Sequence, residues 1–174
     1  MSLKNVNIGD NAPHEINAII EIAANQLPIK YEIDKHTNVP HVDRFLSTAM
    51  QYPCNYGYIP NTLCEDGDPY DVLVITPYPV MAGSVIKIRP IGVMVMTDEA
   101  GKDNKMLAVP VSKLTKEYDH IQNPTDISPA FLNKVSHFFE HYKDLESGKW
   151  VKIEEWLDSE YAINDLAKAI QAYK

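Results

Sequence analysis

The sequence has few cysteines and no long apolar run. Its two cysteines, Cys54 and Cys64, are not spaced as a Cys-x-x-Cys zinc pair. A chain of 174 residues can bury a core without a disulfide, so we expect both thiols to be reduced and semi-buried. Because no apolar run reaches the length of a transmembrane helix, we expect no membrane span.

The chain also lacks an excess of basic residues. Lys and Arg number 16 against 24 Asp and Glu, which gives a net charge of −8 and excludes long-range attraction to nucleic acids or acidic membranes. Residues 1–5 lack the apolar core of a signal peptide, so we expect a cytoplasmic protein. Repeats, low-complexity tracts and linkers are missing, which predicts a single domain over residues 1–174.

Acidic residues gather in one short loop. Residues 65–74 read EDGDPYDVLV and place Asp66, Asp68 and Asp71 close together. Two carboxylates 4 Å apart repel by roughly 4 kcal/mol at an effective dielectric near 20, so the cluster calls for cations between them. Hard oxygen ligands favour Mg²⁺, Mn²⁺ or Ca²⁺. The alternative is an ordinary acidic surface turn.

Two familiar acidic motifs do not fit this loop. An EF-hand loop opening at Asp66 needs Gly at its sixth position and Glu at its twelfth, where the chain has Asp71 and Pro77. An aspartyl-phosphate phosphatase needs an apolar strand before its first aspartate, whereas here the apolar run, residues 72–76, follows.

Residues 84–96 predict one long strand or two short ones bent at residues 90–92, and a second acidic cluster, residues 98–105, follows. If residues 72–76 and 85–96 pair as an antiparallel hairpin, the two acidic clusters meet at one end of the sheet. This convergence favours a site for several metal ions. Residues 107–111 add a strand to an antiparallel meander of the kind that forms small barrels.

The remaining pattern predicts an α+β, mainly β protein. Alternating residues predict strands at 17–24 and 29–33. Ser128 and Pro129 open an amphipathic helix that we expect to close at Gly148. Residues 150–153 then predict a strand, and Ser159 is expected to cap a last helix.

The first of these helices contains an H-x-x-E-H pattern, formed by His137, Glu140 and His141. The pattern is typical of an inverted zinc-protease motif. It also arises when two polar histidines flank a buried pair of phenylalanines, which we prefer because zinc needs a third protein ligand and a cleft.

The D-G-D-P-x-D motif at residues 66–71 resembles the signature of family I soluble inorganic pyrophosphatases, metal-dependent hydrolases of diphosphate. Further segments resemble the bacterial branch in order and spacing: I-E-I, P-I-K-Y-E-I-D, Y-P-C-N-Y-G-Y-I-P-N-T, T-D-E-A-G-x-D-x-K and F-F-E-H-Y-K-D-L. The resemblance covers nearly the whole chain. It implies an inorganic pyrophosphatase domain built as an OB-like five-stranded antiparallel barrel, with two helices from the C-terminal half packed outside, and a homohexamer.

Tyr70 departs from the signature, where a smaller aliphatic residue is expected; its bulk should shift the loop slightly and leave the carboxylates in place.

The resemblance also implies a role for each site residue. Asp68 would be the general base. The residues implied to bind metal are Asp66, Asp71, Asp98 and Asp103, with Glu21 and Glu32 as outer carboxylates. The residues implied to contact the phosphates are Lys30, Arg44, Lys105, Tyr142 and Lys143, with Tyr56 near the nucleophile and the electrophilic phosphate.

The function expected from this resemblance is Mg²⁺-dependent hydrolysis of diphosphate to two orthophosphates, with several ions per site and Mn²⁺ as a substitute. A hydroxide held between two ions would attack phosphorus, and Asp68 would take its proton. Two alternatives from other classes are an OB-type nucleic-acid-binding protein, which the net charge opposes, and a zinc peptidase using His137, Glu140 and His141.

Overall fold

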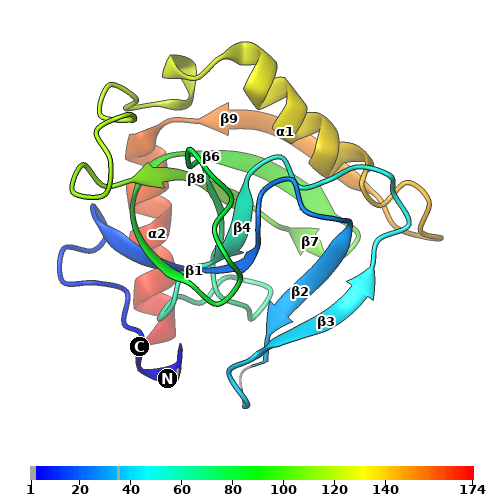
Figure 1. Cartoon of the computed structure of the whole chain (residues 1–174), viewed down its shortest axis with the longest axis horizontal. Helices are drawn as coiled ribbons and strands as arrows, with labels where there is room; N and C mark the ends of the chain where they lie inside the picture. The colour runs from blue at the N-terminus through cyan, green and yellow to red at the C-terminus, as the bar shows by residue number, and fades with distance from the viewer. Residues whose placement is uncertain (1–2, 35) are drawn as a thin grey trace.

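The computed structural model describes residues 3–34 and 36–174, so Met1 and Ser2 of the N-terminal segment discussed above lie outside the described residues. Within them, five strands close into a ring (Figure 1). Around the ring the order is β1, β4, β5, β8 and β6, and β6 pairs with β1 to close it. The strands are β1 (Ile16–Ile22), β4 (Asn55–Tyr58), β5 (Asp71–Val74), β6 (Val85–Asp98) and β8 (Lys105–Pro110).

The pairing within the ring confirms the OB-like barrel but corrects one detail. The expected hairpin of residues 72–76 with 85–96 is wrong, because β8 lies between β5 and β6. Strand β8 runs parallel to β5 and antiparallel to β6, so the ring contains one parallel pair and is not wholly antiparallel. The start of β5 and the end of β6 nevertheless lie at the same end of the barrel. The two acidic clusters therefore converge as expected, through a different pairing.

Strand β6 is long enough to serve several partners. It pairs with β1 through residues 85–88, and a register shift between Pro90 and Gly92 marks the predicted bend. Such a bulge bends a strand and increases its twist, which helps a sheet to close. Beyond the bend, β6 also pairs with β9 (Val151–Leu157) and the short β7 (Gly101–Lys102).

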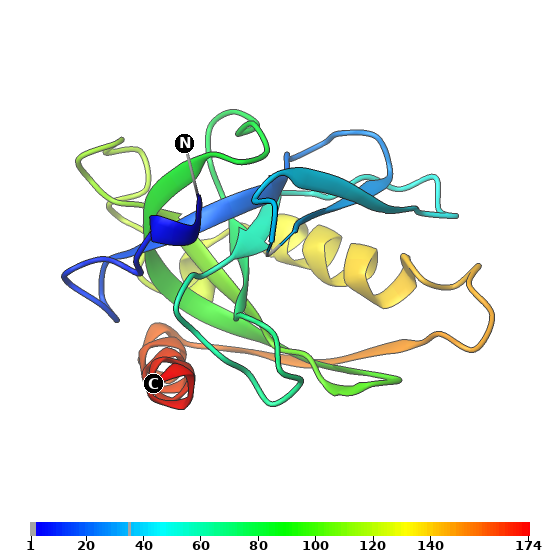
Figure 2. The same ribbon diagram turned by 90° about the horizontal axis from the view of Figure 1, so that it is seen from below.

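The barrel wall is apolar on both faces. Along β5, Leu73 belongs to one core cluster and its neighbours Val72 and Val74 belong to a second. Helix α1 (Pro129–His141) packs Phe138 and Phe139 into the first cluster, and helix α2 (Ser159–Tyr173) packs Leu166 into the second. Figures 1 and 2 show the two helices against different parts of the barrel.

The helix ends differ in part from expectation. Helix α1 begins at Pro129 with Ser128 as its N-cap, as predicted, but ends at His141 rather than running to Gly148. The N-cap of α2 is Asp158, not Ser159: its carboxylate accepts a hydrogen bond from the backbone N–H of Tyr161 at 2.9 Å. Asp caps well for the same reason as Ser, since its oxygen satisfies a free N–H of the first turn.

Three smaller features complete the fold. Strands β2 (Ile29–Ile33) and β3 (Pro40–Phe45) form a hairpin that projects from the side of the ring (Figure 1). Short 3₁₀ helices, η1 (Leu3–Asn5) and η2 (Pro124–Asp126), lie near the N-terminus and before α1. Of the described helices, neither is long and apolar enough to traverse a lipid bilayer.

Both cysteines are free, as predicted, although Cys54 is fully buried and Cys64 half-buried. Burial raises the pKa of each thiol to about 12. Both therefore remain protonated at neutral pH and are poor nucleophiles.

Gly57 in β4 sets how closely β1 and β4 approach. A Cβ atom at this position would lie 1.9 Å from the carbonyl oxygen of Ile19. We predict that Gly57→Ala lowers the free energy of unfolding by about 3 kcal/mol or more, at the upper end of overpacking costs. Gly148→Ala is the control, because that site is open and has φ +76°, so only backbone strain of about 1 kcal/mol is expected. Urea unfolding measures both, and equal losses in the two variants would contradict the close approach.

Candidate active site

A cleft of about 660 Å³ opens where β5, β6 and β8 present the two acidic clusters. The hairpin β2–β3 and the end of α1 also contribute to its walls. Every residue to which the pyrophosphatase resemblance gave a role lines this cleft: Glu21, Lys30, Glu32, Arg44, Tyr56, Asp66, Asp68, Asp71, Asp98, Asp103, Lys105, Tyr142 and Lys143.

The signature loop presents its aspartates through a compact turn. The backbone N–H of Asp68 donates to Asp66 Oδ1 at 3.0 Å, and the carbonyl of Asp68 accepts from Cys64 N at 2.8 Å. This Asx turn leaves Asp66 and Asp68 exposed at the mouth of the cleft. Asp71, the first residue of β5, is half-buried deeper inside.

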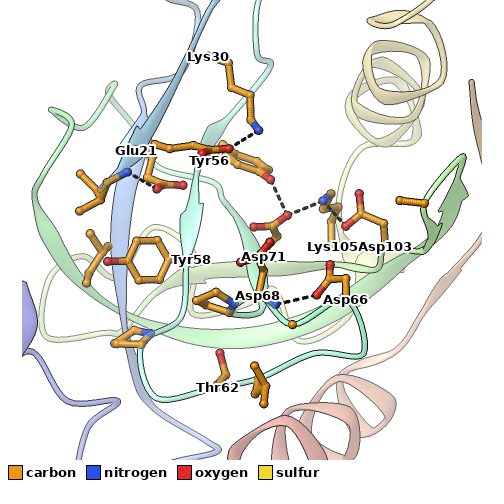
Figure 3. Close-up of a pocket in the computed structure, with 18 of the residues that line it drawn as sticks. Glu21, Lys30, Tyr56, Tyr58, Thr62, Asp66, Asp68, Asp71, Asp103 and Lys105 are labelled. Carbon is orange, nitrogen blue, oxygen red and sulfur yellow. Dashed lines mark hydrogen bonds and ion pairs between the residues drawn. The ribbon is translucent and has the colours of Figure 1, made fainter. Parts of the chain in front are cut away.

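The centre of the cleft is a cation between two acids. Lys105 Nζ donates to Asp71 Oδ2 at 2.5 Å and to Asp103 Oδ1 at 2.6 Å (Figure 3). Burial lowers the pKa of Lys105, but the two carboxylates outweigh burial and raise it overall, so the amine stays charged. Burial in turn raises the pKa of Asp103.

A second lysine repeats this arrangement at the end of β6. Lys143 Nζ, just beyond α1, donates to Asp98 Oδ2 at 2.7 Å, and both side chains are buried. Burial lowers the pKa of Lys143, but the hydrogen bond to Asp98 and the nearby negative charges outweigh burial and raise the pKa overall. Glu99 extends the network by accepting from Lys149 Nζ at 2.6 Å.

The opposite wall carries charges of both signs. Glu21 is buried, and its Oε1 accepts from the backbone N–H of Ile33 at 2.7 Å. Burial raises the pKa of Glu21 to about 8. On the hairpin, Lys30 forms an ion pair with Glu32, and Arg44, which is Lys30's register partner, donates to Glu146 at 3.2 Å.

Two phenols border these charges. Tyr56 Oη donates to Asp71 Oδ2 at 2.5 Å, and Figure 3 shows Asp71 between Tyr56 and Lys105. Tyr142 stacks on Phe138 with ring centroids 5.3 Å apart. Burial raises the pKa of both tyrosines, so each keeps its proton and remains a hydrogen-bond donor.

The donor set of the cleft fits a hard cation. Among residues 3–34 and 36–174, no three His, Cys, Asp or Glu side chains already converge closely enough to enclose an ion. In the cleft the ammonium groups of Lys105 and Lys143 lie against the carboxylates instead. The acids supply only oxygen, which Mg²⁺ and Mn²⁺ prefer, and the lysines place positive charge directly beside them.

His137 and His141 lie away from this cleft. Their rings are 4.7 Å apart on α1, and His141 Nδ1 contacts Asp144 at 2.8 Å. Phe138 and Phe139 between them are buried. This placement favours the interpretation that the H-x-x-E-H pattern consists of polar positions flanking a buried aromatic pair.

Comparison with known proteins decides the family. The family model described as inorganic pyrophosphatase matches residues 18–174. The chain belongs to the inorganic pyrophosphatase family. It is 58% identical to the inorganic pyrophosphatase of Escherichia coli K12 over 174 residues, which cover all of this chain and 99% of that protein.

Solved structures of the family agree with the fold. The inorganic pyrophosphatase of Thermus thermophilus superposes with a TM-score of 0.94 at 39% identity and covers 99% of each chain. That of Helicobacter pylori superposes with a TM-score of 0.92 at 44% identity, covering 97% of this chain and 98% of the other. Pyrophosphatases are generally metal-dependent, in keeping with the donor set of the cleft.

The sequence reasoning missed several contributors to this pyrophosphatase cleft. Tyr52 lines it and contacts the Tyr56 ring at 5.4 Å, although its sequence context resembles packing. Glu146 holds Arg44 across 102 residues, and no sequence pattern links the two. Glu99, by contrast, stands beside Asp98 in the second acidic cluster, so the sequence alone could have identified it as a site residue.

The raised pKa of Glu21 predicts a pH-dependent stability. The folded pKa is about 8 against an ordinary 4.5, so between these values the folded state binds a proton that the unfolded state lacks. The free energy of unfolding should therefore fall as pH rises through this window, by at most about 1.4 kcal/mol per pH unit.

Glu21→Gln should remove this slope, because the amide is uncharged and its oxygen can still accept from Ile33 N. Urea unfolding of chelator-treated protein at several pH values measures the slope. If wild type and variant lose stability equally over the window, Glu21 is not protonated in the folded state.

Proposed function

We propose that this pyrophosphatase-family chain hydrolyses inorganic diphosphate to two orthophosphates with Mg²⁺ as the physiological cofactor. The observation that carries the proposal is a cleft in which buried lysines alternate with aspartates, Lys105 between Asp71 and Asp103 and Lys143 against Asp98. Such a cleft offers carboxylates to cations and ammonium groups to a polyanion at once. The family membership supports the same reaction.

The metal-binding residues proposed are the carboxylates of the two converging clusters. The inner ligands would be Asp66, Asp71, Asp98 and Asp103, and the outer carboxylates Glu21 and Glu32. Mn²⁺ could replace Mg²⁺ because both prefer oxygen ligands. When bound, the ions would lower the pKa of an attacking water and neutralise phosphate charge.

Asp68 is the proposed general base. Its side chain is exposed at the cleft mouth, and the Asx turn with Asp66 fixes its backbone. A carboxylate there can take the proton of the attacking water, provided the water lies within hydrogen-bond reach.

The proposed phosphate contacts are the cations and phenols that line the walls. Arg44 offers a planar fork of donors, whereas a lysine ammonium acts as a point charge. Tyr56 keeps its proton and would donate near the nucleophile and the electrophilic phosphate. The remaining proposed contacts are Lys30, Lys105, Tyr142 and Lys143.

Three broader expectations belong to the same proposal. Residues 1–174 would act as one catalytic domain in the cytoplasm. Assembly as a homohexamer is supported by the sequence resemblance and by exposed apolar side chains, among them Phe45, which is 73% exposed, and Met81, which is 77% exposed. Nucleic-acid binding is disfavoured by the net charge of −8.

The reaction is tested by phosphate release from diphosphate. Purified protein with Mg²⁺ should release orthophosphate, and excess chelator should abolish release because the carboxylates alone cannot activate water. Turnover that survives the chelator, or no turnover with Mg²⁺ or Mn²⁺, would contradict the proposal.

The role of Asp68 is tested by Asp68→Asn. The amide keeps the size of the side chain but cannot take a proton, so turnover should fall by about 10²- to 10⁴-fold. Manganese binding, measured by calorimetry, should stay within about threefold of wild type, since Asp68 is not proposed to hold metal. The matched control is His137→Ala with His141→Ala, which should leave turnover unchanged. Wild-type turnover in Asp68→Asn would refute the assignment.

A further inference from the structure

Tyr70 lies inside the signature loop, between Asp68 and Asp71, but its side chain is 2% exposed and belongs to the core cluster under α2. Its backbone is fixed on both sides. The N–H donates to Thr62 Oγ1 at 2.9 Å, and the carbonyl accepts from Ile59 N at 2.9 Å. The unusual bulk at this position is thus accommodated by the core and leaves the neighbouring aspartates lining the cleft.

The phenol of Tyr70 reaches a charged residue of α2. Tyr70 Oη donates to Asp165 Oδ2 at 2.7 Å. The same carboxylate oxygen is the acceptor of a long contact of 3.5 Å from Asn104 Nδ2. Asn104 stands between Asp103 and Lys105, so one oxygen on α2 contacts both loops that carry the acids of the cleft.

The register of the barrel explains why these two residues share a partner. The parallel ladder of β5 and β8 begins at the pair Val72 and Met106. Tyr70 and Asn104 each stand two residues before that pair. By strand periodicity their side chains continue the same face, at a point that precedes the first pair of the ladder. At this position the ladder no longer fixes the distance between the two segments.

The packing around this point is open. A hollow of about 230 Å³ lies beside the two loops and is lined by Tyr70, Asn104 and Asp165 among others. A backbone hydrogen bond ties this loop region to α2, from Leu63 N to the carbonyl of Ala169 at 3.0 Å. Beside this hollow, polar contacts also tie the two acidic loops, Lys105 to Asp71 directly and Asp165 to both Tyr70 and Asn104.

We propose that Asp165 is a positioning residue that holds the signature loop, through Tyr70, and the second acidic loop, through Asn104, at the separation that divalent-cation binding requires. This inference rests on the proposed function, because the acids of these loops are the metal ligands proposed there. Ligands already held in place bind an ion more tightly, since less conformational freedom is lost on binding. Outer residues that orient metal ligands have this effect in many metal sites.

Manganese titration of chelator-stripped protein by calorimetry tests the proposal. Tyr70→Phe removes only the hydroxyl, and Asp165→Ala removes the shared acceptor. Each should weaken Mn²⁺ binding by about 3- to 10-fold, the effect of one hydrogen bond in an outer position. Because both changes break one linkage, the double variant should bind within about twofold of Asp165→Ala alone.

A second readout separates positioning from substrate binding. In Tyr70→Phe the Mg²⁺ concentration for half-maximal turnover should rise, whereas KM for diphosphate at saturating Mg²⁺ should stay at the wild-type value. Ser136→Ala is the matched control: it removes a hydrogen bond of 3.1 Å from Trp156 on β9 to α1. It should leave Mn²⁺ binding unchanged, whatever its effect on Tm.

Two results would overturn the proposal. One is a lower Tm in Tyr70→Phe and Asp165→Ala with wild-type Mn²⁺ affinity, which would make the contact merely structural. The other is a double variant whose losses add in full. If Asp165→Ala fails to fold, Tyr70→Phe alone decides. A wild-type protein that binds Mn²⁺ but releases no phosphate would refute the proposed function and leave the positioning role standing.

Discussion

The contact of the buried Lys105 ammonium with Asp71 and Asp103 is the interaction on which the cleft depends. Without a cation, two carboxylates 4 Å apart would repel by roughly 4 kcal/mol at an effective dielectric near 20. The barrel creates this arrangement directly, because Asp71 is the first residue of β5 and Lys105 the first of β8. The parallel pairing of these strands brings both side chains to the same end, so the register of the ladder sets the charge pattern of the site.

The same logic explains what kind of ligand the cleft suits. Lys143 against Asp98 repeats the acid and base pairing at the end of β6. Paired charges neutralise each other in the resting protein, and a ligand that brings both signs can replace each partner at once. A divalent cation bound to a phosphoanhydride is such a ligand: its metal competes for the carboxylates and its oxygens for the ammonium groups. Affinity for either component should therefore depend on the other.

Much of this arrangement could be predicted from the sequence, for identifiable reasons. The alternation of apolar and polar residues predicts the strands, and the spacing of the aspartates predicts the acidic clusters. Both are local signals. The pairing of β5 with β8 could not be read from the sequence, because a parallel neighbour leaves no local pattern and an adjacent hairpin is the simpler assumption. The partners of Arg44 and Tyr70, namely Glu146 and Asp165, are distant in sequence and ordinary in context.

The most direct measurement of the central claim is the anomalous scattering of Mn²⁺ in crystals of the wild-type protein. The claim is that the two acidic clusters remain neighbours in order to hold divalent cations. It predicts manganese peaks in the cleft within bonding distance of carboxylates from both clusters, Asp66 or Asp71 on one side and Asp98 or Asp103 on the other. Manganese found only outside the cleft, or bound by one cluster with the other turned away, would contradict it.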